Sequence, residues 1–192
     1  MRVIAGSRRG RLIRTPPGDS VRPTYDRVRE SLFAILEPEL QGASVLDLFA
    51  GSGSLGIESL SRGAGSATFV EKDPSVLRVA RRNVDDLGLA DSSRLIRGDA
   101  MQLLAGVVPG SPFDVAFVDP PYASGLAPVA VRALDESGLL ADGAVVVVEH
   151  ATSNELDETV GRLTRVRSKR YGSTAVDFYE TRAARPGGEE QT

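Results

Sequence analysis

The segment 45–58 constrains the fold more than any other part of the chain. Its first half, 45–50, is short and mostly apolar, as expected of a parallel strand buried on both faces. The sequence Gly-Ser-Gly at 51–53 interrupts the run, and a helical pattern begins at about Leu55. Because a glycine turn between a strand and a helix lets a ligand approach the backbone, the segment predicts a nucleoside-cofactor site at the carboxyl end of the strand.

An acid inside that strand bears on which cofactor binds. Residues 51–56 match the pattern G-x-G-x-x-G, which by itself suits a nicotinamide or flavin cofactor as well. Asp47 lies within the strand, where a buried carboxylate is costly unless another group pairs with it. A pyrophosphate would be repelled there, whereas the ammonium group of S-adenosylmethionine would be attracted. The segment therefore favours a methyl donor over a dinucleotide.

The composition is that of an ordinary soluble globular protein. A length of 192 residues predicts one domain with a small extension, and 41% hydrophobic and 26% charged residues are usual values. The absence of cysteine excludes disulfides and a cysteine nucleophile, and with one histidine we expect no metal site. Because the chain has neither a membrane-length apolar run nor a secretory signal, we expect a cytoplasmic protein that does not bind membranes.

Positive charge gathers near the two ends of the chain, although the net charge is −3. Residues 1–29 hold eight arginines and two acids, and residues 162–170 hold five basic residues and no acid. Two basic segments on an acidic body indicate a polyanion-binding surface. Solvated surface arginines are the alternative explanation, and we favour nucleic acid.

Strand and helix patterns alternate from residue 43 onward, which predicts a parallel α/β sheet. We expect strands at 44–49, 67–71, 94–97, 114–118 and 144–149, and helices at 55–62, 74–87, 100–105 and 125–137. Two further β-rich segments, 162–171 and 174–182, have so short a link that they must be antiparallel.

The residues before this pattern form a basic extension. Short β segments at 2–5 and 11–14 flank a loop with two arginines and predict a hairpin, and 24–36 predicts a helix. The hairpin is too small for a core of its own, so we expect an appendage. The predicted division is an extension at 1–22, a main domain at 23–182 and a disordered tail at 183–192.

Acids follow the second and third predicted strands as well. Glu71 lies 20 residues after Gly51, a spacing that suits hydrogen bonds from ribose hydroxyls. Asp99 is placed to accept a bond from an adenine amino group, with the N–H of Ala100 near the adjacent ring nitrogen. Together with Asp47 these acids would line one edge of the sheet. Each alone is more often a solvated carboxylate or a helix cap, but all three would rarely occur together by chance.

The fourth predicted strand ends in Asp-Pro-Pro-Tyr, residues 119–122. The two prolines fix the backbone and remove two N–H donors, which leaves a rigid rim of carbonyl oxygens beside a carboxylate and an aromatic ring. Such a rim suits a planar amine, because the oxygens accept its N–H bonds and the ring stacks on it with about 1–3 kcal/mol per base. The alternative is an ordinary turn with a packing tyrosine.

With these motifs the chain resembles the RsmD family of class I, S-adenosylmethionine-dependent methyltransferases. The resemblance rests on Asp-Leu-Phe-Ala-Gly-Ser-Gly at 47–53, on Asp-Pro-Pro-Tyr, and on the runs 4–10 and 22–33. It implies a Rossmann-like, seven-stranded, mostly parallel sheet with an antiparallel C-terminal hairpin. It also implies methyl transfer to the exocyclic N2 of a guanine in 16S ribosomal RNA, within the small subunit or an assembly intermediate, with release of S-adenosylhomocysteine. A monomer is the default expectation, since no sequence pattern indicates an oligomer.

The resemblance further implies a role for each matching residue. The cofactor would be bound by Asp47, Phe49, Gly51, Gly53, Glu71, Lys72, Asp99 and Ala100, with Thr24 and Arg27 over its pocket. The catalytic residues that clamp the guanine would be Asp119, Pro120, Pro121 and Tyr122. RNA phosphates would be held by Arg8, Arg9, Arg11, Arg22, Arg167, Lys169 and Arg170. His150 is interpreted as structural.

Three alternatives stay open on the sequence alone. The same Asp-Pro-Pro-Tyr serves adenine N6 in DNA or a glutamine amide in a protein, although a separate DNA-reading domain is lacking. A nicotinamide oxidoreductase that uses residues 51–56 leaves Asp-Pro-Pro-Tyr unexplained. A non-catalytic RNA-binding module would not need the acids.

Overall fold

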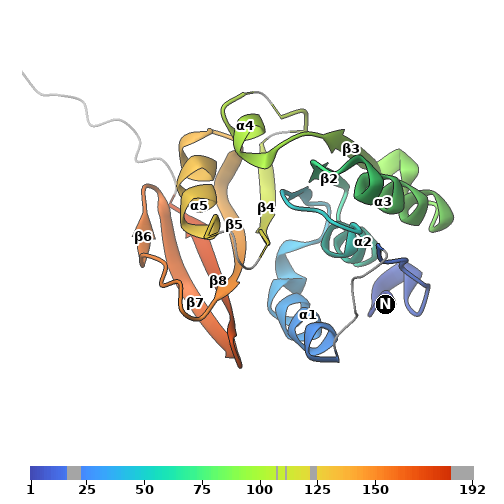
Figure 1. The fold of residues 1–192 in the computed structure, drawn as a ribbon, viewed down its shortest axis with the longest axis horizontal. Coiled ribbons are helices and arrows are strands. Elements are labelled where there is room, and N and C mark those ends of the chain that lie inside the picture. The colour runs from blue at the N-terminus through green and yellow to red at the C-terminus, as the bar shows by residue number, and fades with distance from the viewer. Residues whose placement is uncertain (17–22, 107, 111, 122–124, 183–192) are drawn as a thin grey trace, which may run out of the picture.

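The chain folds into one twisted sheet with helices on both faces (Figure 1). The computed structural model describes residues 1–16, 23–106, 108–110, 112–121 and 125–182, with the backbone alone for 23–26. Its strands are β1 (Ser44–Asp47), β2 (Ser66–Glu71), β3 (Ser93–Arg97), β4 (Phe113–Val118), β5 (Leu140–Ala151), β6 (Thr159–Val160), β7 (Leu163–Tyr171) and β8 (Thr174–Thr181).

The sheet confirms the predicted parallel core and antiparallel C-terminal hairpin. β1 to β5 pair with one another in parallel, and β8 runs antiparallel to both β5 and β7. Within the described residues the order is β3-β2-β1-β4-β5-β8-β7-β6. This is one strand more than the seven predicted, because β6 has two residues and is too short to produce a recognisable pattern.

Helices cover the two faces unequally. α1 (Pro23–Leu36), α2 (Ser54–Ser61) and α3 (Pro74–Asp86) pack on one face, and α4 (Ala100–Leu104) and α5 (Ala127–Glu136) pack on the other. Short 3-10 turns occupy Gly6–Arg8, Glu37–Glu39 and Ala90–Ser92. Each α-helix lies within two residues of its predicted range. No described helix has the length and apolar character needed to cross a bilayer.

The N-terminal segment reverses direction as predicted, but it is built into the main core. Its two arms share an isolated antiparallel bridge between Arg2 and Leu12. Val3 and Ile13 are 2% and 1% exposed and belong to the core under α1 and α2. The segment is therefore packed against the α/β body rather than appended to it. Its predicted division from the main domain at residue 22 stays a prediction, and the predicted tail at 183–192 lies outside the described residues.

Glu58 of α2 anchors this N-terminal segment. Its two carboxylate oxygens accept hydrogen bonds from the backbone N–H groups of Ile4 and Ala5, at 2.8 and 3.0 Å. Gly6 follows with φ +78°, and a Cβ there would lie 1.8 Å from the carbonyl oxygen of Ser61. Only glycine allows the segment to approach α2 this closely.

Candidate active site

The carboxyl ends of five adjacent parallel strands bring five acids to one edge of the sheet. The sheet order predicts their sequence along that edge, because parallel strands end on the same side. From the β3 end to the β5 end they are Asp99, Glu71, Asp47, Asp119 and Glu149. The first four were predicted from the sequence and the fifth was not.

The glycine loop after β1 has the backbone conformation that its sequence predicts. Gly51 and Gly53 have φ values of +54° and +83°, in the left-handed region that side chains disfavour. Gly56 serves a different purpose, since a Cβ there would lie 2.3 Å from the ring of Phe69 on β2. The first two glycines shape the loop, and the third allows α2 to pack closely on the sheet.

Asp47 is the buried acid beneath this loop. It is 1% exposed, and its Oδ2 accepts a hydrogen bond from the backbone N–H of Gly56 at 3.1 Å. Burial raises the pKa of Asp47 to about 7, with the Gly56 N–H opposing and the nearby Asp119 and Glu71 charges adding to the rise. A cationic ligand at this point would stabilise the carboxylate.

Glu71 braces the same loop from β2. One carboxylate oxygen accepts a bond from the N–H of Gly51 at 3.0 Å, and the other accepts from the N–H of Asp73 at 2.8 Å. This bracing was not foreseen from the sequence. A carboxylate has about four acceptor sites, so these two bonds leave capacity for ribose hydroxyls. The adjacent Lys72 is exposed.

Asp99 caps the helix that follows β3. Its side chain accepts a hydrogen bond from the N–H of Met101 at 3.0 Å, and Ala100 behind it is buried. The cap holds the carboxylate at the carboxyl edge, beside Glu71 on the neighbouring strand. Phe49, also predicted for the cofactor, is partly buried against the core on the α4 and α5 side.

The end of β4 places the predicted clamp next to Asp47. Asp119 is half-buried, and burial raises its pKa to about 7. Pro120 is buried behind it and Pro121 is exposed. Tyr122, the predicted stacking ring, lies outside the described residues.

Glu149 completes the row and was missed because no sequence motif surrounds it. Val118 and Val148 are paired across β4 and β5, so Asp119 and Glu149 follow them side by side on adjacent strands. Burial, and then the charge of Asp119, raise the pKa of Glu149 to about 8. Its place after the valine run of a predicted strand, like that of the other acids, is the pattern that would have found it.

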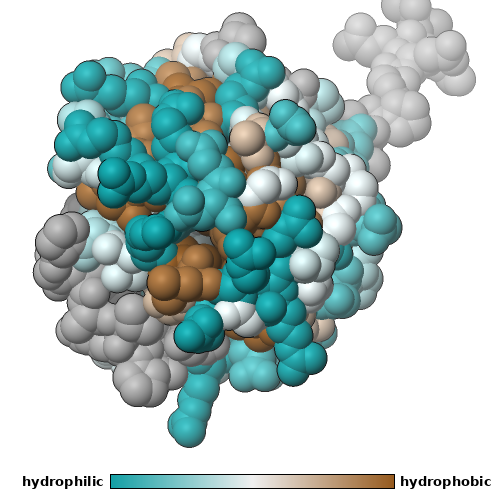
Figure 2. Space-filling view, turned by 90° about the vertical axis from the view of Figure 1, so that its right-hand side faces the viewer, coloured by the Kyte–Doolittle hydropathy of each residue, from teal (hydrophilic) through white to brown (hydrophobic). Residues whose placement is uncertain are grey.

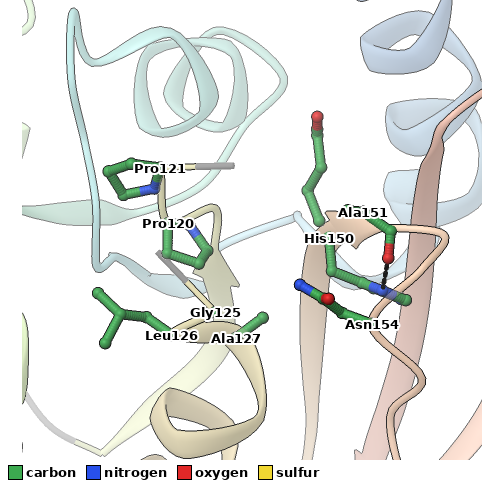
Figure 3. A pocket seen from close by; sticks show the side chains of 9 residues that line it. Pro120, Pro121, Gly125, Leu126, Ala127, His150, Ala151 and Asn154 are labelled. Carbon is green, nitrogen blue, oxygen red and sulfur yellow. Dashed lines mark hydrogen bonds between the residues drawn. The ribbon is translucent and has the colours of Figure 1, made fainter. Parts of the chain in front are cut away.

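A shallow hollow opens between the ends of β4 and β5. Figure 3 shows the proline pair, Pro120 and Pro121, facing His150 and Asn154 across it, with Leu126 on the proline side. Glu149 also lines this hollow. Proline carbonyls, an acid and apolar groups together suit a flat, partly polar ligand.

His150 belongs to a buried network that ties β5 to the C-terminal hairpin. Its Nε2 lies 3.3 Å from Oδ2 of Asp177, which also accepts a bond from Arg165 Nη1 at 3.0 Å. Burial lowers the pKa of His150, but hydrogen bonds to Asp177 and to the Ala151 carbonyl outweigh it, so the pKa is raised. For Asp177, burial alone would raise the pKa, but hydrogen bonds from His150, Ser168 and Arg165 outweigh burial and lower the pKa to about 2. These contacts agree with a structural role for His150.

The predicted RNA-binding arginines of the N-terminal segment differ in what they contact. Arg8 donates from Nε to the Leu87 carbonyl at 2.6 Å, and Arg11 donates from Nη2 to the Asp86 carbonyl at 3.0 Å, so both bind the end of α3. Arg9 is exposed and has no side-chain partner among the described residues. The face that carries α3 and this segment is mostly hydrophilic, with apolar patches between the polar side chains (Figure 2).

The second basic group lies at the other end of the molecule, on β7 (Figure 1). Arg167, Lys169 and Arg170 are exposed, and β7 ends beside the carboxyl end of β5, with β8 between them. Tyr171, next along, donates from its hydroxyl to Ser31 of α1 at 2.6 Å. The β7 group therefore borders the edge where the acids lie.

Three residues predicted near the cofactor or RNA are only partly placed. Arg27 is exposed on α1, and no ion pair of it occurs among the described residues. Thr24 lies in the first turn of α1, where only the backbone is described. Arg22 lies outside the described residues. No cluster of three acidic or histidine side chains arranged for a metal ion occurs in the described part of the chain.

Comparison with known proteins places this chain among methyltransferases. The family model for conserved hypothetical protein 95 matches residues 1–180. Ribosomal RNA small subunit methyltransferase D of Escherichia coli (strain K12) is 39% identical over 183 residues, covering 95% of this chain and 91% of that protein. The same-named protein of Haemophilus influenzae is 35% identical, over 94% of this chain and 93% of that one.

Solved structures show the same architecture. The structure of yhhF from Escherichia coli has a TM-score of 0.86 and 40% identity, and the match covers 96% of this chain and 99% of that one. An RNA methyltransferase from Salinibacter ruber, solved with S-adenosyl-L-homocysteine, has a TM-score of 0.62 and 19% identity, over 90% of this chain and 100% of that one. The second likeness supports the fold alone.

Proposed function

The chain belongs to the RsmD family, the family of conserved hypothetical protein 95, and we propose that it methylates the exocyclic N2 of one guanine in 16S ribosomal RNA. The enzyme is a ribosomal RNA methyltransferase that uses S-adenosyl-L-methionine. The choice of guanine N2 is the part we add. The observation that supports it most is the row of acids that continues from the glycine loop to the proline pair.

The half of this row nearest the glycine loop fits S-adenosylmethionine. The buried carboxyl of Asp47 suits the ammonium group, Glu71 the ribose and Asp99 the adenine. A phosphate-bearing cofactor would meet three acids there and be repelled. When bound, the cofactor supplies a methyl group that its sulfonium has already activated.

The residues at the end of β4 then orient the target amine of guanine toward the cofactor. The N2 protons of guanine would be accepted by Asp119 and by the Pro120 carbonyl, which draws the nitrogen lone pair out of conjugation and aims it at the methyl group. The chain contributes orientation and electrostatics. A new N–C bond forms as the C–S bond breaks, and the positively charged nitrogen then loses its proton readily. No strong base is needed.

The basic surfaces suit a structured RNA. We infer that the β7 group, which borders the site, and Arg9, on the N-terminal segment, bind phosphates, since both are exposed and basic. A paired target base would first have to be flipped out of its stack, at a cost of a few kcal/mol. We expect a cytoplasmic monomer that acts on the small subunit or on an assembly intermediate.

Mass spectrometry of small-subunit RNA tests the proposed function. RNA from cells that lack this protein should miss one methyl group on a single guanosine, and the wild-type gene should restore it. A gene carrying Asp119→Ala should not restore it. A methyl group missing from an adenosine, or from no nucleotide at all, would overturn the assignment to guanine N2.

A further inference from the structure

Two carboxyl groups in the row have no hydrogen-bond partner among the described residues: those of Asp119 and Glu149. The other three acids each accept at least one backbone N–H bond. Half-buried oxygen atoms without partners lose hydration and gain nothing in return. These two groups follow a pair of matched residues on adjacent strands, and Glu149 lines the hollow beside them, so they are suited to binding polar atoms of a ligand.

The order of the strands places Asp119 nearer to the glycine loop and Glu149 farther from it. β4, which carries Asp119, lies between β1 with its glycine loop and β5 with Glu149. Adjacent strands are about 4.8 Å apart, a spacing similar to the length of the hydrogen-bonding edge of guanine. A guanine whose N2 lies at Asp119, facing the cofactor, would therefore extend its N1 and O6 away from the cofactor, toward Glu149.

We propose that Glu149 binds the N1–H and O6 atoms of the target guanine and so determines the specificity of this enzyme for guanine. The carboxyl carbonyl oxygen accepts the N1–H, and the carboxyl O–H donates to O6. The proposal rests on the proposed function, because it takes the N2 position as the one that reacts. Adenine has an acceptor at N1 and an amine at C6, so it would have to reverse both hydrogen bonds, and it has no C2 amine to place at Asp119.

The electrostatics of the hollow support the acid form that this pairing needs. Burial and the neighbouring charge of Asp119 raise the pKa of Glu149 to about 8, so near neutral pH the group keeps its proton. Asp47 adds a further acid two strands away. A protonated carboxyl group offers a donor and an acceptor together, whereas a carboxylate offers acceptors alone.

The test compares two target bases in two enzymes. Small-subunit RNA is ligated with guanine or with 2-aminopurine at the target position, since 2-aminopurine keeps the C2 amine but lacks the N1–H and O6. The wild-type enzyme should prefer guanine in kcat/KM by about 10- to 100-fold, the usual value of a two-bond base contact. In Glu149→Ala this preference should fall toward one, through loss of guanine activity alone.

The variant Glu149→Gln separates base recognition from a structural role. Its amide has the same shape, donates an N–H to O6 and accepts the N1–H, so it should keep most of the preference. Glu155→Ala, an exposed acid a few residues away, is the matched control and should behave as wild type. Binding of S-adenosylhomocysteine should be the same in all variants, which shows that they fold.

Three outcomes would overturn this role for Glu149. They are an unchanged guanine preference in Glu149→Ala, an equal loss with both bases, and a Glu149→Gln enzyme as unselective as the alanine variant. Failure of the proposed function looks different, because the wild-type enzyme would then methylate neither base at the C2 amine.

Discussion

The two halves of the carboxyl edge hold their acids in different ways. On the cofactor half, Glu71 and Asp99 accept backbone N–H bonds from the loops beside them, at 2.8 to 3.0 Å. On the base half, Asp119 and Glu149 have no such bonds among the described residues, and burial raises the pKa of each. Backbone hydrogen bonds fix the position of the cofactor-half acids before a ligand binds. The base-half acids, which lack such bonds among the described residues, can accept hydrogen bonds from the ligand instead.

Asp47 stands between these two groups and has a property of each. It accepts one bond from Gly56, as the cofactor acids do, and its pKa is raised by burial, as in the base half. The comparison therefore predicts that substitutions on one half affect cofactor binding and those on the other affect transfer.

The largest effect is expected from Asp119→Ala. Removal of the acid that orients the amine should lower methyl transfer at least about 100-fold, by analogy with the loss of one oriented polar group at other reacting centres. Binding of S-adenosylhomocysteine, measured by calorimetry, should change little, because Asp119 is assigned to the base half. If cofactor binding is lost as well, the two halves are not separate.

Glu71→Gln should give the opposite result. One side-chain oxygen becomes an amide nitrogen, so either the Gly51 or the Asp73 N–H loses its acceptor. A lost hydrogen bond to a charged group costs about 1.5–3 kcal/mol, so the dissociation constant of S-adenosylhomocysteine should rise roughly 10- to 100-fold. At saturating cofactor, kcat should recover. A reduced kcat with unchanged affinity would contradict the assignment.

The pH dependence of the reaction is expected to reflect the base half. Asp119 accepts N–H bonds best when ionised, and its ionised fraction grows as the pH rises through its pKa of about 7. The kcat/KM for RNA should therefore increase from about pH 5 to about pH 7, and it should fall again above about pH 8, where Glu149 loses the proton that it donates to the base. An aspartate with the ordinary pKa of 3.8 would give a flat profile over this range. Such a profile would contradict the raised pKa that distinguishes Asp119 from the acids of the cofactor half.

The smallest effects on activity are expected from substitutions of the N-terminal arginines. Here Arg9, which has no side-chain partner among the described residues, can be compared with Arg8, which binds the end of α3. Arg9→Ala should raise the RNA dissociation constant a few-fold and reduce the salt slope by about 0.7–0.9, the value for one phosphate contact. Arg8→Ala should instead lower the melting temperature, because Arg8 binds the end of α3. If both variants change the salt slope equally, the contacts of Arg8 do not exclude RNA binding.

Much of the fold could be predicted because its elements are local patterns. The alternation of apolar strands and helices is determined by periodicity, and each predicted helix was found within two residues. β6 was missed because a strand of two residues has no period to detect. The N-terminal segment was expected as an appendage, yet Val3 and Ile13 lie in the core, since a few apolar residues do not reveal which surface they will pack against.

The sequence by itself determined the glycine turn, the order of strands and helices, and the identity of four of the five acids, because each follows from residue type and spacing along the chain. Only the tertiary structure decided which acids have partners and that Glu149 lies beside Asp119. It also decided that the third glycine of the motif packs against Phe69. The physical reason is that burial, hydrogen bonding and pKa depend on neighbours in space, which here come from strands far apart in the chain.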